Sequence, residues 1–163
     1  MSNAKKMHKC PDCGQFVPLR REEVPFGLIG KWAATVEAQV YDCACGRGVV
    51  YEAVGPMLQA IAAAVIKKPS RLAPEEIRFL REHLAMSAKE FGRLVGVTPS
   101  QVSRWENGAP MGTTADRLVR MIEVQHDNVE FDVQQLAEIG DTARAPMRLR
   151  AVRNKDGSWK AAA

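Results

Sequence analysis

Residues 86–108 constrain the fold of this chain most, because they have the pattern of two short helices joined by a tight turn. Ser87 is a favourable N-cap, and Glu90 three positions later completes a capping box. The first helix would then bury an apolar stripe at helical spacing: Phe91, Leu94 and Val95. Gly96 ends this helix, where a left-handed residue is expected. Val97 follows as a plausible buried residue of the turn.

The second helix of this segment is predicted to be amphipathic, with one apolar and one polar face. Thr98 caps it, and Pro99 suits its first position because the missing N–H would be unpaired there anyway. Val102 and Trp105 would face the core. The opposite side carries Pro99, Ser100, Gln101 and Arg104, and the helix stops at Asn107-Gly108. Such a helix can enter a DNA major groove while its back packs on a core. The alternative is a helical hairpin with a solvated face, in which Arg104 pairs with a nearby glutamate.

This segment resembles the helix-turn-helix of the Cro/repressor (Xre-type) regulators. The resemblance implies that residues 99–106 enter the major groove, with Ser100, Gln101 and Arg104 as the base-reading candidates. Arg104 would bind guanine through O6 and N7, and Gln101 would bind adenine through N6 and N7. The full expected DNA-binding set is Ser87, Lys89, Thr98, Pro99, Ser100, Gln101, Ser103, Arg104 and Asn107. Ala88 departs from the glutamine common in the family, so contact from that turn would depend on backbone N–H groups and Lys89.

Flanking segments supply the rest of an all-α bundle. A helix over residues 57–66 is followed by a linker, residues 69–74, and by a helix that starts at Pro74. Its expected core positions are Ile77, Phe79, Leu80 and Leu84. Thr113 is expected to cap the last helix. On that helix, Leu118, Val119 and Ile122 would face the core or a second subunit.

The four cysteines all lie in the first 45 residues, as two pairs. Cys10 and Cys13 flank a tight turn that ends in Gly14, so that both thiolates can converge on one ion. Cys43 and Cys45 follow about thirty residues later. Two pairs at this separation predict a structural zinc ion held by four thiolates, which leaves no open position for catalysis.

The second cysteine pair has one intervening residue rather than the usual two. It can still reach one ion if Gly46 bends the chain sharply. If Cys43 or Cys45 does not bind, His8 is the nearest substitute, and free buried cysteines are the remaining alternative. The N-terminus has no secretory signal, and no apolar run reaches a membrane-spanning length. We therefore expect a cytoplasmic protein in a reducing compartment, where paired thiols bind metal.

These patterns predict a multi-domain α+β chain. A small zinc-bound β-rich N-terminal module would precede an all-α lambda-repressor-like helix-turn-helix domain and a short C-terminal extension. Strand-favouring residues in segments 32–41 and 49–51 suggest a three-stranded sheet that needs the metal to fold. The expected divisions are residues 1–55 for the zinc-ribbon-like module, 56–69 for a connecting helix and linker, 70–126 for the DNA-binding domain, and 127–163 for the extension.

The charge of the chain is concentrated where DNA binding is expected. Residues 67–126 carry ten basic and seven acidic side chains, whereas residues 127–163 are balanced. This modest excess favours phosphate contacts by the helical domain. The extension has a hairpin pattern around Gly157 and several basic residues: Arg148, Arg150, Arg153, Lys155 and Lys160. We interpret it as a lightly packed tail rather than as a DNA-touching arm.

The order of parts, from Cys10 to about Glu123, resembles the MqsA (YgiT-type) antitoxin family. Residues 71–81, which lead into the repressor-like domain, belong to the resemblance, whereas the segment beyond about Asp127 lies outside it. The resemblance implies that the zinc module binds a toxin nuclease and that the helix-turn-helix domain dimerises on a palindromic operator and represses its own operon. It also implies that the four cysteines are ligands.

The sequence therefore predicts a sequence-specific repressor with a structural zinc, antitoxin-like and autoregulatory. Two alternatives stay open: an interaction module that mainly neutralises a toxin, and an orphan regulator with no toxin. An enzyme is not expected, because the chain has no paired acid–base residues, no phosphate-binding glycine loop and no nucleophile with a histidine partner. The three histidines, His8, His83 and His126, read as scattered surface or helix-end residues.

Overall fold

The computed structural model describes residues 6–27, 33–140 and 146–163. Residue 32, at the start of one expected strand segment, lies outside the described residues. The strands are β1 (Met7–Lys9), β2 (Phe16–Pro18), β3 (Arg20–Gly27), β4 (Ala33–Cys43), β5 (Gly46–Val50), β6 (Arg150–Arg153) and β7 (Trp159–Ala162). The helices are α1 (Val54–Ile66), α2 (Pro74–His83), α3 (Ala88–Val95), α4 (Pro99–Glu106), α5 (Thr113–Asp127) and a 3-10 turn, Val133–Leu136. A β-rich N-terminal region with a cysteine cluster thus precedes a helical region, as expected for an α+β chain.

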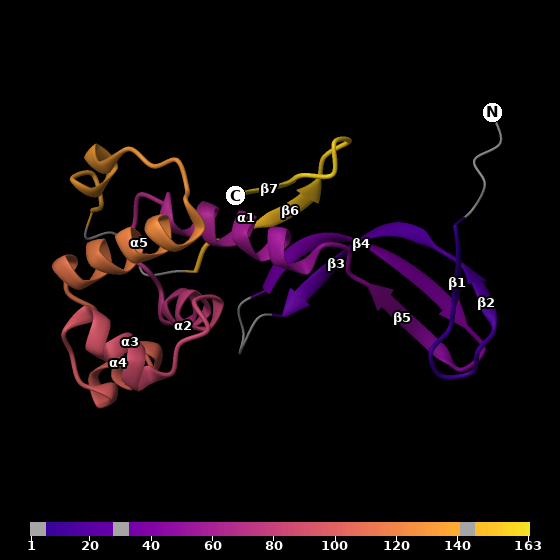
Figure 1. Cartoon of the computed structure of the whole chain (residues 1–163), viewed down its shortest axis with the longest axis horizontal. Coiled ribbons are helices and arrows are strands. Elements are labelled where there is room, and N and C mark those ends of the chain that lie inside the picture. Colours follow the sequence, from indigo (N-terminus) through magenta and orange to yellow (C-terminus); the bar gives the residue numbers. More distant parts are fainter. Residues whose placement is uncertain (1–5, 28–32, 141–145) are drawn as a thin grey trace.

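The long strand β4 organises the sheet. β3 pairs antiparallel with β4 along one edge. The other edge is shared, because the end of β4 pairs with β5 and its beginning pairs in parallel with β6. β1 and β2 form a separate two-stranded ribbon. Figure 1 shows this ribbon and the helices at opposite ends of an elongated molecule.

The C-terminal segment is part of this sheet, so the expectation of a lightly packed tail is wrong. β6 and β7 form a hairpin, and β6 adds to β4 with Thr35 opposite Arg150. Leu149 and Ala151 are buried in the main core. The sheet therefore has five strands rather than three, and two of them come from the end of the chain.

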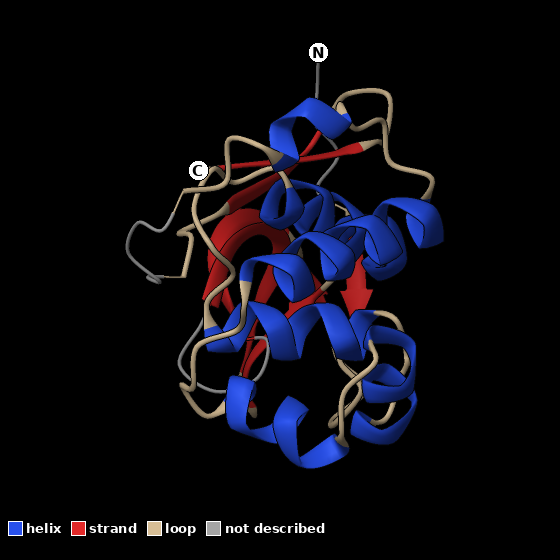
Figure 2. Cartoon of the chain, turned by 90° about the vertical axis from the view of Figure 1, so that its left-hand side faces the viewer, coloured by secondary structure: helices blue, strands red, loops and turns tan. Residues whose placement is uncertain are grey.

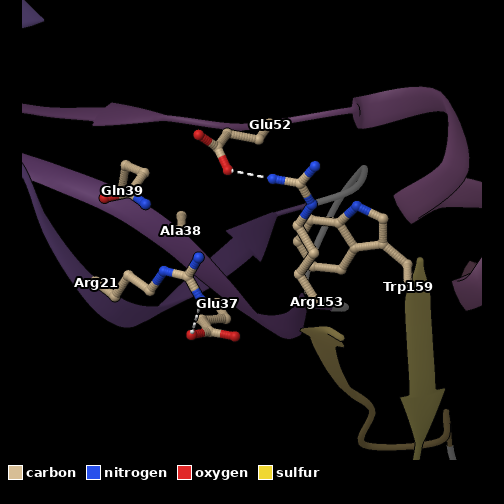
Figure 3. Close-up of a pocket in the computed structure, with 7 residues that line it drawn as sticks. All are labelled: Arg21, Glu37, Ala38, Gln39, Glu52, Arg153 and Trp159. Carbon is tan, nitrogen blue, oxygen red and sulfur yellow. Dashed lines mark hydrogen bonds and ion pairs between the residues drawn. The ribbon is translucent and has the colours of Figure 1, made fainter. Parts of the chain in front are cut away.

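Next to the β6–β7 hairpin lies a polar hollow, in which an ion pair holds the hairpin in place. The hollow is lined by Arg21, Glu37, Ala38, Gln39, Glu52, Arg153 and Trp159 (Figure 3). The Arg153 guanidinium reaches the Glu52 carboxylate at 2.6 Å, and Arg21 lies 3.4 Å from Glu37. The first contact ties the C-terminal hairpin to the segment between β5 and α1, and the second joins β3 to β4.

Helix α1 connects the sheet to the helical bundle. It contacts β6 and β7 on one side and α2 and α5 on the other. Met57, Ile61 and Val65 are fully buried along its inner face. Figure 2 shows the helices gathered in front of the strands. The main core contains Val36 of β4, Ile61 of α1 and Phe91 of α3, and so joins the sheet to the helices.

The inner face of α5 differs from the expected apolar stripe. Val119 is buried and Ile122 packs partly buried against the core, as predicted, but Leu118 is 38% exposed. The other fully buried positions of the helix are charged: Asp116, Arg120 and Glu123. Arg120 donates to Asp116 at 2.7 Å and to the carbonyls of Ile66, Lys68 and Ser70. The inner face is polar because it binds the backbone of the linker that crosses it.

Two smaller expectations are also corrected. Thr113 does not cap α5, whose N-cap is Gly112. Its hydroxyl instead accepts a hydrogen bond from Arg71, which ties the linker to the start of α5. Leu94 is 49% exposed and lies outside the core that Phe91 occupies.

Candidate DNA interface and cysteine cluster

The turn between α3 and α4 has the local geometry that the sequence predicts. The Ser87 hydroxyl accepts from the Glu90 N–H, and the Glu90 carboxylate accepts from the Ser87 N–H at 2.8 Å. Gly96 caps α3 with a left-handed φ of 83°. Thr98 then caps α4 by accepting from the Gln101 N–H at 3.2 Å. The capping box and both caps are therefore confirmed.

Gly92 lets the two helices meet closely. A Cβ at this position would lie 2.7 Å from the carbonyl oxygen of Val97 and 3.4 Å from Val102 Cγ2. The first contact is with backbone, which cannot rotate away. The close approach of α3 to the start of α4 therefore depends on the absence of a side chain at Gly92. This approach sets the direction in which the exposed face of α4 points.

We expect Gly92→Ala to lower the free energy of unfolding by about 1–3 kcal/mol, which is typical of overpacking. This loss should exceed the gain of about 0.5–1 kcal/mol that alanine gives in a helix interior. Gly55→Ala in α1 is the matched control, because nothing lies within 4 Å of its added Cβ. Urea unfolding of both variants checks the prediction, and equal stability of the two would contradict it.

The exposed face of α4 carries the residues expected to read bases. Val102 and Trp105 are buried, as predicted, whereas Ser100, Ser103 and Arg104 are exposed and Gln101 is half-buried. Lys89 and Pro99 are exposed beside them. The exposed residues at the start of α3 and on α4 therefore include the polar and cationic side chains of the expected DNA-binding set.

The Arg104 guanidinium is not held by an acidic neighbour. Within the described ranges it has neither a hydrogen-bond nor an ion-pair partner. The adjacent Glu106 is bound instead by Arg81 at 2.5 Å and by Arg78 at 3.3 Å, both from α2. The alternative in which Arg104 pairs with a surface glutamate therefore has no support in this structure.

Other residues of the expected DNA-binding set have structural roles of their own. The Asn107 side chain donates to the Ser103 carbonyl at 2.7 Å and closes the end of α4. The Ser87 and Thr98 hydroxyls serve as caps. These groups stay at the surface, so a cap and a phosphate contact can be combined at the same residue.

The cysteine pairs meet at the far end of the molecule. Cys10 and Cys13 come from the turn after β1, and Cys43 and Cys45 from the turn between β4 and β5. The Cys10 and Cys45 sulfurs are 3.5 Å apart, those of Cys13 and Cys43 are 3.3 Å apart, and all four lie within 4.8 Å of one another. A tetrahedral ion with bonds of about 2.3 Å to sulfur needs separations of about 3.8 Å. The four thiols could thus hold one metal ion.

The one-residue spacing of the second pair has a simple cause. Cys43 is the last residue of β4 and pairs with Gly46, so Cys45 lies in the hairpin turn between them. Gly46 has a φ of 145°, which favours glycine. The hairpin therefore turns both sulfurs the same way. His8 is not part of the group, since its ring packs on Tyr41 with centroids 5.1 Å apart.

The turn N–H groups favour a thiolate at Cys10. Hydrogen bonds from the N–H groups of Cys13 and Asp12 lower the pKa of the Cys10 thiol to about 7. The neighbouring sulfur of Cys10, followed by those of Cys13 and Cys43, raises the pKa of Cys45. Without a cation the cluster therefore favours a thiolate at Cys10 and a neutral thiol at Cys45.

The histidines are less scattered than the sequence suggested. His83, the last residue of α2, and His126, in the last turn of α5, have ring centroids 5.9 Å apart. Glu123 and Asp127 join them in one group. Burial, and then the nearby Asp127 carboxylate, raise the pKa of Glu123 to about 8. The spacing of residues 123, 126 and 127 in the sequence indicates that they share one face of a helix, but nothing in the sequence indicates that His83 of α2 joins them.

Two short helices at a fixed angle, with a polar face on the second, define a helix-turn-helix DNA-binding domain. A family model described as helix-turn-helix matches residues 77–127, from α2 to the end of α5. The chain thus carries a DNA-binding regulatory domain of the Xre type, which implies double-stranded DNA as its partner and is not typically enzymatic. No curated protein and no solved structure matches the chain.

None of the helices in the described ranges combines the length and the apolar character that a bilayer crossing requires.

Proposed function

We propose that this protein is a sequence-specific repressor that acts as a homodimer on a palindromic operator. Residues 70–126 form the DNA-binding domain, and a structural zinc ion holds together the two cysteine turns within residues 1–55. The observation that carries this proposal is the exposed face of α4, where the Arg104 side chain is extended without an acidic partner among the described residues. In a dimer, two such helices would enter successive major grooves about 34 Å apart. The exposed Leu118 on α5 offers one apolar contact for dimerisation.

We expect Arg104→Ala to lower operator affinity by about 1–3 kcal/mol, or about 5–150-fold, and to relax the choice of base at one position in each half-site. The operator is obtained by selecting bound duplexes from a random pool, and affinity is measured by fluorescence anisotropy at fixed salt. Arg148→Ala is the control, because Arg148 is equally exposed but lies outside the helix-turn-helix. Unchanged affinity and selectivity in Arg104→Ala would refute the assignment.

The cysteine cluster supports the zinc part of the proposal. Four sulfurs within 4.8 Å of one another are a soft, thiolate-only donor set, which suits zinc and leaves no position for substrate. The ion would hold the turn after β1 against the turn between β4 and β5. Its role is structural.

A second candidate function, neutralisation of a toxin, is favoured by the outer face of the β1–β2 ribbon. Phe16 is 69% exposed and Met7 is 54% exposed, and the pairing register places both on the face opposite the buried Val17. Exposed apolar groups on a rigid ribbon are typical of protein interaction sites. A nuclease-like chain encoded beside this protein should co-purify with it and should lose binding in Phe16→Ser. An orphan gene would favour the plain regulator.

A further inference from the structure

A second group of metal-ligating side chains lies within the helical domain, far from the cysteines. Glu123, His126 and Asp127 occupy the last turns of α5, and their spacing places them on one face of the helix. His83 ends α2 and points into the same group. One ligand atom from each of the four residues lies within 4.8 Å of the others.

The contacts in this group are short and polar. His83 Nε2 lies 2.7 Å from Asp127 Oδ2 and 3.3 Å from Glu123 Oε1. His126 Nδ1 lies 2.8 Å from Asp127 Oδ1. The His83 ring stacks on Phe79, with centroids 5.9 Å apart, which fixes the direction of its nitrogen. The donors are therefore held in place before any ion arrives.

Glu123 is the independent sign that something is bound here. The residue is fully buried, and apart from the 3.3 Å approach of His83 Nε2 to Oε1, neither of its carboxylate oxygens has a well-formed hydrogen bond from the described residues. Buried carboxylates in folded proteins are normally hydrogen-bonded, paired or bound to a metal. A buried carboxylate that lacks well-formed hydrogen bonds and lies next to two imidazoles has the surroundings of a metal ligand.

We propose that His83, Glu123, His126 and Asp127 bind one divalent transition-metal ion of the zinc class through two imidazole nitrogens and carboxylate oxygens. Bonds of about 2.0–2.1 Å in a tetrahedron need donor separations of about 3.3 Å, close to those present. Mixed imidazole and carboxylate donors suit zinc, cobalt and nickel ions better than calcium or magnesium. The ion replaces the His83–Asp127 hydrogen bond, and any proton on a coordinating imidazole nitrogen or on the Glu123 carboxyl leaves as it binds, while the other nitrogen of each imidazole keeps its proton.

Such an ion would link the end of α2 to the end of α5. These helices frame the helix-turn-helix, since α3 contacts α5 and α4 contacts α2. An ion that binds only the folded bundle stabilises it by mass action. This inference depends neither on zinc at the cysteines nor on an antitoxin role.

Cobalt titration of the full chain tests the proposal. The chain first receives one molar equivalent of Zn²⁺, which the thiolates take in preference, and Co²⁺ is then added. We expect one further equivalent of Co²⁺ to bind with tetrahedral d–d absorption but without sulfur-to-cobalt charge-transfer bands. Glu123→Gln should weaken this binding by more than about 100-fold, because even outer-shell partners of a metal contribute about 10–100-fold. Glu130→Gln, an exposed carboxylate just after α5, is the matched control.

Folding and binding are separable in this experiment. Glu123→Gln keeps the side-chain shape, and the carboxyl group that it replaces is mostly protonated and uncharged near neutral pH because its pKa is raised to about 8. With chelator present, the melting temperature of this variant should therefore stay close to that of the wild type. His126→Gln, at a side chain that is 46% exposed, gives a second binding-deficient variant. Absence of the further equivalent, charge-transfer bands alone, or equal binding by wild type and Glu123→Gln would each overturn the proposal. Two bound equivalents of Co²⁺, with charge-transfer bands from only one of them, would show a vacant cysteine site and leave this one supported.

Discussion

Arg120→Ala is expected to lower the free energy of unfolding by about 3–5 kcal/mol, because it breaks a buried ion pair by removing one partner. Arg120 is 1% exposed, and its guanidinium binds Asp116 and three backbone carbonyls at the end of α1 and in the linker after it. The variant leaves Asp116 charged and buried, and the carbonyls of Ile66, Lys68 and Ser70 lose a donor. For a chain of this length the melting temperature should fall by about 6–20 °C.

The measurement is urea unfolding followed by circular dichroism, with operator binding as a second readout. Arg93→Ala, an exposed arginine in the last turn of α3, should cost less than about 1 kcal/mol. The double variant Asp116→Leu with Arg120→Met should recover much of the loss, since replacing a whole buried pair by apolar groups is often tolerated. An Arg120→Ala chain as stable as Arg93→Ala would show that the network is not structural.

The helix-turn-helix could be predicted because its signals are local. Caps at Ser87 and Thr98, glycines at positions 92 and 96 and a buried Val102 all lie within one short segment and agree with one another. The polar surface of α4 follows from that agreement. Nothing in it depends on a distant part of the chain.

The C-terminal strands could not be predicted in their place, because their partner is far away in sequence. Thr35 pairs with Arg150, so the sheet needs a strand that follows the whole helical domain in the sequence. A hairpin pattern around Gly157 indicates two strands but not the edge they join. Basic residues that read as a loose tail are ion-paired instead: Arg150 with Glu23, and Arg153 with Glu52.

The face of α5 was misjudged for a related reason. Periodicity assigns apolar residues to the core, and on this helix Asp116, Arg120 and Glu123 occupy those positions. Their partners are linker carbonyls and a histidine of α2, which no pattern within α5 reveals. The cysteine cluster was predicted more fully, because the two residues of each pair are close in sequence. Only the contact between the two pairs depends on residues that are far apart in sequence.

Removal of metal from the cysteine cluster should unfold the β1–β2 ribbon and leave the DNA-binding domain folded. The ribbon has its own small core of Cys10, Val17 and Tyr41, separate from the main core that holds the helices. A two-stranded ribbon is marginally stable alone, whereas structural zinc contributes about 10–16 kcal/mol in small zinc-bound peptides. We therefore expect chelator to remove hydrogen-exchange protection from residues 6–19 and to change operator affinity by less than a few-fold.

Cys10→Ser should reproduce the chelated state, because Cys10 is the buried thiol of the cluster and lies in the ribbon core. Zn²⁺ should restore protection to the chelated wild type but not to this variant, and Mg²⁺ should restore neither, since thiolates favour the softer ion. Protection that survives chelation would mean that the thiols pack without a metal. Loss of protection in α2–α5 as well would mean that the two cores fold as one unit, because the long strand β4 passes from the cysteine turn directly into the main core.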